Sequence, residues 1–102
     1  MTHLVQILLP LYDNTGVAFP SILFKDVQGR LAKQFHGLTA YSRVAAEGFW
    51  RTGDLMKHDE IVVYEVMTRS FNLAWWKKFR KHLEKDFRQD SIVIRAQSII
   101  QP

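Results

Sequence analysis

Apolar and polar positions alternate with a period of two in several short stretches of this chain, and each such stretch predicts a β-strand. In the stretch nearest the N-terminus, Val5, Ile7 and Leu9 share one face of the expected strand. The opposite face also carries leucines, at Leu4 and Leu8. Because both faces are largely apolar, the pattern predicts a buried, central strand.

Three later stretches also predict strands: residues 38–47, residues 60–67 and residues 91–97. The stretch over residues 60–67 gives the clearest signal, because it is dense in β-branched side chains. A cluster of turn-forming residues, Asp13 to Gly16, ends the first strand and separates it from the helical pattern that follows.

Between these strands, apolar residues twice recur every three to four positions, which is typical of a helix with one buried face. Four residues form the stripe of the first helix: Leu23, Val27, Leu31 and Phe35. We expect this helix to begin near Pro20, with Ser21 as a capping residue. Gly37 stands where a left-handed residue would end the helix.

The second helix has a similar stripe: Trp76, Phe79, Leu83 and Phe87. Ser70 or Asn72 is expected to cap its N-terminus. Trp75 lies about 100° around the helix from its neighbour, so we expect it at the flank of the stripe. The residues that we expect to be almost fully buried are Leu31, Phe35, Phe79, Leu83 and Phe87.

The elements therefore follow the order strand, helix, strand, and then the same order again. This order predicts one α+β domain over residues 1–102, a ferredoxin-like βαββαβ sandwich with an antiparallel four-stranded sheet and both helices on one face. The other face of the sheet would then be uncovered. A small sheet with an apolar open face is expected to dimerise or to bind a ligand there, and we expect a homodimer.

Three short motifs follow one another along the chain. They are Phe-x-Gly-x-Thr at Phe35, Gly37 and Thr39, then Gly-x-Trp at Gly48 and Trp50, then Phe-x-Gln-x-Ser-Ile at Phe87, Gln89, Ser91 and Ile92. In these motifs the chain resembles a family of small bacterial domains of unknown function. The resemblance implies a ferredoxin-like fold and a bacterial protein, and it brings no activity with it.

Composition narrows the classes of function. The chain of 102 residues contains no cysteine, which excludes disulfides, thiolate metal sites and thiol nucleophiles. The N-terminal apolar run lacks a basic start and a cleavage site, so we expect no signal peptide and a cytoplasmic protein without a membrane anchor. The formal net charge of +4 is only mildly basic.

The predicted open face of the sheet is the best candidate site for a ligand. Alternation along the strands places five polar residues on it: Gln6, Tyr41, Arg43, Glu65 and Arg95. A pair of arginines recognises carboxylate or phosphate groups, so this cluster predicts a small anionic or polar ligand. The alternative is that the same residues form a salt-bridged dimer interface or a solvated surface.

The second helix carries a basic stripe, Lys77, Lys81 and Lys85, which is the alternative site for a nucleic acid. Neither middle strand has the aromatic pattern by which sheet-based RNA binders read bases, so nucleic acid is not the leading expectation. Four histidines occur without the spacing of a metal site, and we expect no metal.

The sequence contains no nucleophile elbow, phosphate-binding loop or dinucleotide fingerprint. Whether the chain is an enzyme and whether it binds a cofactor therefore stay open, although these absences favour a protein without catalytic activity. The leading expectation is a small binding or assembly module, with any ligand on the open sheet face or at a dimer interface. The alternatives are a small enzyme that uses a cavity between the sheet and a partner subunit, and a weak nucleic-acid binder.

Overall fold

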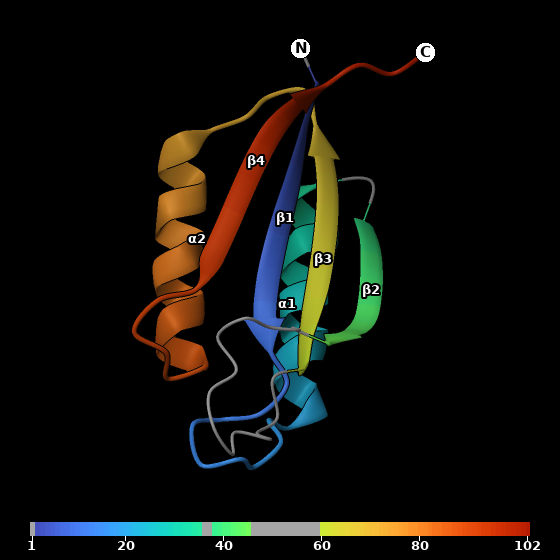
Figure 1. Cartoon of the computed structure of the whole chain (residues 1–102). Helices are drawn as coiled ribbons and strands as arrows, with labels where there is room; N and C mark the ends of the chain where they lie inside the picture. Colours follow the sequence, from blue (N-terminus) through green and yellow to red (C-terminus); the bar gives the residue numbers. More distant parts are fainter. Residues whose placement is uncertain (1, 36–37, 46–59) are drawn as a thin grey trace.

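The computed structural model describes residues 2–35, 38–45 and 60–102, and for residues 38–45 and 60 the description covers the backbone alone. Six elements follow one another along the chain: β1 (Thr2–Pro10), α1 (Ser21–Gln34), β2 (Leu38–Ala45), β3 (Glu60–Thr68), α2 (Leu73–Asp86) and β4 (Val93–Ile99). Figure 1 shows the strands side by side, with the helices behind and beside them.

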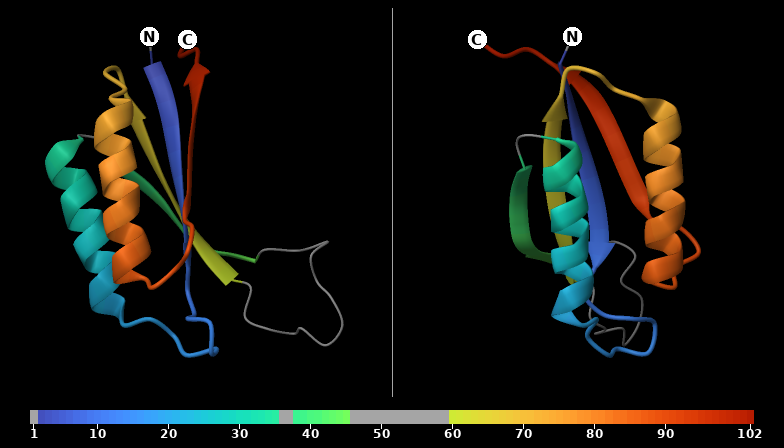
Figure 2. Two further views of the ribbon diagram at one scale, coloured as in Figure 1. Left: turned by 90° about the vertical axis from the view of Figure 1, so that its left-hand side faces the viewer. Right: turned by 180° about the vertical axis from the view of Figure 1, so that it is seen from behind.

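The strands form one sheet in the order β2-β3-β1-β4. Every neighbouring pair is antiparallel. Both helices lie on the same side of this sheet, which is plainest in the left view of Figure 2. The predicted α+β class is therefore confirmed, and β1 is a central strand of the sheet, as the sequence predicted.

Alternation along β1 divides its residues between the two faces of the sheet. Val5, Ile7 and Leu9 are fully buried and belong to the core beneath the helices. Their partners on β3 also belong to that core: Val66, Tyr64 and Val62. The helices thus cover the face of β1 that is apolar from Val5 to Leu9, and the face that Gln6 interrupts is the open one.

Both helices contribute the apolar stripe that their sequence predicted. Val27 and Leu31 of α1 are buried, as are Trp76, Phe79 and Leu83 of α2. Phe87, directly after α2, has no exposed surface.

The expectation of near-complete burial is confirmed for four of the five residues: Leu31, Phe79, Leu83 and Phe87. It is wrong for Phe35, which is only partly buried. Phe35 is the C-cap of α1 and has extended backbone angles, so it follows the helix and lies at the margin of the core. Its ring stacks on Trp76 there, with centroids 5.2 Å apart.

α1 begins directly after Pro20, as predicted, but its cap differs from the expectation. Pro20 occupies the N-cap position, and its side chain has no capping hydrogen bond. Leu23 donates its backbone N–H to the Pro20 carbonyl at 3.0 Å. Ser21 is already the first residue of the helix, so it is not the cap that the sequence predicted.

The last strand also begins later than predicted. β4 starts at Val93 rather than at Ser91, and it continues to Ile99. The backbone N–H of Ile92 donates to Glu84 Oε2 at 3.0 Å, so this segment is held by α2 instead of pairing with β1. The predicted second strand is observed as far as Ala45, and Gly37, like the remainder of that stretch, lies outside the described residues.

Both ends of α2 have a defined cap. At the N-terminus, Asn72 Oδ1 accepts the backbone N–H of Trp75 at 3.0 Å, so of the two predicted caps Asn72 is the one used. At the C-terminus, Gln89 N–H donates to the Glu84 carbonyl and Arg88 N–H to the Lys85 carbonyl. This pair of bonds is a Schellman motif, and Arg88 takes its left-handed position with a φ of 50°.

The turn after β1 is organised by one carboxylate. Asp13 Oδ1 accepts hydrogen bonds from the Thr15 hydroxyl, the Thr15 backbone N–H and the Val17 backbone N–H. These bonds stabilise the charged form, the one from the Thr15 hydroxyl most of all, and they lower the pKa of Asp13 below its ordinary value of 3.8. Gly16 has a φ of 88°, which a glycine adopts without strain.

Candidate functional site

The open face of the sheet carries the second apolar set of the strands. Leu4 and Leu8 of β1 are half-buried, although no described helix covers this face (Figure 2). Val93 of β4 is 50% exposed and Met67 of β3 is 49% exposed. A sheet face that contacts only solvent usually carries polar side chains. The two ends of this face are instead apolar.

A row of polar side chains crosses the middle of this face. Gln6 lies opposite Glu65 on β3 and opposite Arg95 on β4. Gln6 Nε2 donates to Glu65 Oε2 at 2.7 Å, and Arg95 Nε donates to Gln6 Oε1 at 2.8 Å. The amide of Gln6 thus joins a cation and an anion that stand two strands apart.

The structure brings together three of the five residues that the sequence predicted for a ligand. Gln6, Glu65 and Arg95 form the polar row described above. The backbone of Tyr41 pairs with Val63, but its side chain and that of Arg43 lie outside the described residues. The arginine pair on which the anionic ligand depended is therefore described only at Arg95, and the ligand stays a prediction.

The chemistry of the polar row favours recognition. A carboxylate, a primary amide and a guanidinium in one hydrogen-bonded line offer both donors and acceptors to a partner. Glu65 and Gln6 are partly buried, whereas Arg95 is exposed at the side of the sheet. A partner that covers this row must match its polarity at the centre and its apolar side chains at the ends.

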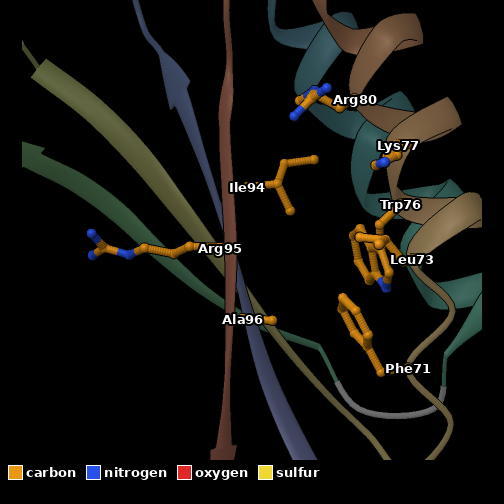
Figure 3. Close-up of a pocket in the computed structure, with 8 residues that line it drawn as sticks. All are labelled: Phe71, Leu73, Trp76, Lys77, Arg80, Ile94, Arg95 and Ala96. Atoms are coloured by element: carbon orange, nitrogen blue, oxygen red, sulfur yellow. The ribbon is translucent and has the colours of Figure 1, made fainter.

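A second surface feature, an open groove, lies between α2 and β4 (Figure 3). Its lining consists of Phe71, Leu73, Trp76, Lys77, Arg80, Ile94, Arg95 and Ala96. Sequence reasoning missed this groove. The one available signal was Leu73, an apolar residue at the start of α2 outside the buried stripe, and it is 56% exposed.

The predicted basic stripe is present on α2, where Lys77, Lys81 and Lys85 are all exposed. Lys77 lines the groove beside β4. The stripe is distinct from the buried face of Trp76 and Leu83, so it contacts solvent along the helix.

The two described histidines each lie beside an aromatic side chain. His3 stacks on Phe71 with ring centroids 5.1 Å apart. His82 lies exposed beside Trp75 and Lys78. Among the residues that the structure describes, no three His, Cys, Asp or Glu residues gather as a metal would require. His36 and His58 lie outside that part of the chain.

Comparisons with known proteins add no relative. No family model matches the chain, and no curated protein or solved structure is similar enough to be matched. Within the described residues, neither helix has the length and apolar character needed to cross a membrane.

Proposed function

We propose that this chain is a small assembly module of ferredoxin-like architecture, which pairs the open face of its sheet with a second copy of itself. The observation that carries the proposal is the apolar open face with a hydrogen-bonded polar row across its centre. The strand order β2-β3-β1-β4 and the two helices on one side support the ferredoxin-like assignment.

The residues at the ends of the open face supply the reason to associate. Val93 and Met67 are each about half exposed, and Leu4, Leu8 and Ile61 are half-buried beside them. Covering such side chains removes apolar surface from water at about 25 cal/mol per Å². A two-fold dimer places the same patch on both copies, so one surface suffices for the whole interface.

The polar row supports a defined orientation of the two copies. Two purely apolar faces can pack against each other in several orientations. A central amide and charged groups, in contrast, must find hydrogen-bond partners when they are desolvated. Gln6 already satisfies Glu65 and Arg95 within one copy, which reduces the cost of covering them. Assembly therefore combines apolar burial with a pre-formed polar centre.

Sedimentation equilibrium tests this proposal with one variant and one matched control. The native chain is expected to be a dimer at micromolar concentration. Val93→Glu places a carboxylate on the open face of each copy and is expected to raise the dimer dissociation constant by about 100-fold or more, because a desolvated charge costs several kcal/mol.

The matched control is Val17→Glu, since Val17 is 60% exposed in the loop before α1. This variant is expected to dimerise like the native chain. A native chain that stays monomeric at high micromolar concentration would remove the proposal. It would also remove the alternative of an enzyme with a cavity between sheet and partner.

A further inference from the structure

The groove between α2 and β4 belongs neither to the buried core nor to the open face of the sheet. It holds about 370 Å³ of space, part of it open to solvent. In Figure 3, Ile94 and Ala96 point from β4 toward α2, whereas Arg95 points to the opposite face of the sheet. The groove therefore lies on the helix side of the sheet, at its β4 edge, away from the proposed dimer face.

The apolar part of the groove gathers at the end where α2 begins. Leu73 is 56% exposed there, and Phe71 is partly buried next to it. Trp76 is only 3% exposed, so its ring closes the inner wall. One apolar side chain from outside could pack among these three residues and would cover Leu73.

The β4 strand itself offers a backbone partner. β4 pairs with β1 along one edge, and none of the described strands pairs with its other edge. An unpaired edge presents N–H and C=O groups to any extended chain that approaches it. An added strand would bring every second side chain into the groove and the others to the side of Arg95.

The charge of the groove is positive. Lys77 and Arg80 are the charged residues that α2 contributes to the lining. The Nε atom of Arg80 is buried without a hydrogen-bond partner among the described residues, and the nearest carboxylate oxygen, on Glu84, is 3.7 Å away. Arg95 adds a third cation on the other side of the same strand.

These charges decide against a second copy of this chain as the occupant. Lysine and arginine occupy five positions of α2 against two acidic residues, Glu84 and Asp86. Pairing two β4 edges around a two-fold axis would bring two such basic helices toward each other, which like charges oppose. An acidic partner instead meets complementary charge at Lys77 and Arg80.

We propose that the groove binds an extended, acidic peptide segment of another protein, which pairs with the edge of β4 that no described strand occupies. The lining spans Leu73 to Arg80 on α2, about 10 Å at 1.5 Å per helical residue, and so takes about three extended residues. An apolar side chain of the segment packs on Leu73 and Phe71. Carboxylates of the segment meet Lys77 and Arg80 on the helix side of the sheet.

The proposed recognition is β-augmentation, in which backbone hydrogen bonds supply affinity and alternate side chains supply selectivity. A nucleic acid would fit this surface less well. Its phosphates could meet the cations, but it has no regular N–H and C=O ladder for the β4 edge, and Trp76 is too buried to stack on a base.

A fluorescein-labelled synthetic peptide, with one valine flanked on each side by two glutamates, tests the proposal by fluorescence anisotropy. Binding to the native chain is expected, and the counterpart with lysines in place of the glutamates is expected not to bind. Lys77→Glu is expected to weaken binding by about 10-fold or more. Lys78→Glu is the matched control, because Lys78 lies on the same helix beside Phe79 and His82, outside the groove.

Two N-methylated versions of the peptide test the strand pairing. One is methylated at the valine nitrogen and the other at the nitrogens of the adjacent glutamates. Neighbouring N–H groups of an extended chain point to opposite sides, so one version is expected to lose binding and the other to keep it.

Several outcomes would overturn the proposal. These are equal losses for Lys77→Glu and Lys78→Glu, equal binding of both N-methylated peptides, or failure of the acidic peptide to bind at all. Displacement of the peptide by a single-stranded oligonucleotide of equal affinity would make the groove a phosphate-binding surface instead. Peptide-induced amide shifts confined to residues 93–99 and α2 in NMR spectra would support the peptide proposal. An unchanged melting temperature of each variant would confirm that the variant is folded.

Discussion

Aromatic side chains pack against one another where the C-terminus of α1 meets the N-terminal half of α2. Phe79 stacks on Trp75 with ring centroids 5.0 Å apart and meets Trp76 edge-on at 5.8 Å. Phe35 reaches the same group from the end of α1, edge-on to Trp75 at 5.3 Å. Such pairs add about 0.5–1.5 kcal/mol to the free energy of unfolding beyond their buried area.

Phe79→Ala is expected to lower the free energy of unfolding by about 3–5 kcal/mol, because it removes a buried ring and leaves a cavity. Phe79 is 5% exposed, so little of that loss can be recovered by solvation. Urea denaturation followed by tryptophan fluorescence measures the change. The control is Ile22→Ala on α1, where the side chain is 64% exposed and the expected loss is below about 0.5 kcal/mol. Similar losses in both variants would contradict the packing.

At the scale of single elements, the C-terminus of α2 is the most informative of the helix and strand ends. Arg88 takes a left-handed conformation that glycine adopts freely, and this costs an L-residue about 1–2 kcal/mol. Its guanidinium lies 3.7 Å from Asp13 Oδ2 and 5.8 Å from the centre of the Phe19 ring. Arg88 therefore links the end of α2 to the loop that follows β1.

Two substitutions separate the backbone cost from these contacts. Arg88→Ala removes the contacts and keeps the left-handed cost, whereas Arg88→Gly removes both. Arg88→Gly is therefore expected to be more stable than Arg88→Ala by about 1 kcal/mol, measured by thermal denaturation of both variants. Equal stability of the two would mean that the left-handed residue is not strained here.

Elements with strong periodicity could be predicted from the sequence, whereas some of their ends could not. The stripes of α1 and α2 and the alternation of β1 are local patterns that burial reinforces. The start of β4 depends on Glu84, eight positions before Ile92, and the burial of Phe35 depends on which neighbours cover its ring. Such dependences involve tertiary contacts, which local patterns do not contain.

The candidate sites show the same division. Alternation sufficed to place Gln6, Glu65 and Arg95 on one face, because side chains of a strand change sides at every residue. The groove between α2 and β4 could not be predicted, since it depends on the distance between two elements and on which strand lies at the edge. In the sequence, the alternation around Ile94 indicates only a core position.

At the scale of the whole molecule, the net charge of +4 predicts a weak attraction to polyanions. We expect the chain to bind single-stranded DNA with a dissociation constant of about 10⁻⁴–10⁻⁶ M at physiological salt, without sequence preference. Changing Lys77, Lys81 and Lys85 together to alanine is expected to flatten the dependence of log K on log salt, by about one unit for each phosphate that these lysines neutralise.

The control for that experiment changes three exposed cations outside α2: Lys25, Lys33 and Arg69. It alters the net charge equally, so an equal change in slope would mean that only total charge matters. A tight, sequence-selective complex that the α2 variant alone abolishes would instead make nucleic-acid binding the leading function.

The position of β1 has a consequence for how the chain folds during synthesis. Its partners β3 and β4 follow it along the chain by about 60 and about 90 residues, as the pairs Gln6–Glu65 and Gln6–Arg95 illustrate. Contacts so distant in sequence close large loops, which slows folding. Until β3 has emerged from the ribosome, both apolar faces of β1 remain outside a sheet, and β4 closes its second edge later still. The nascent protein is therefore most prone to aggregation before β4 has emerged.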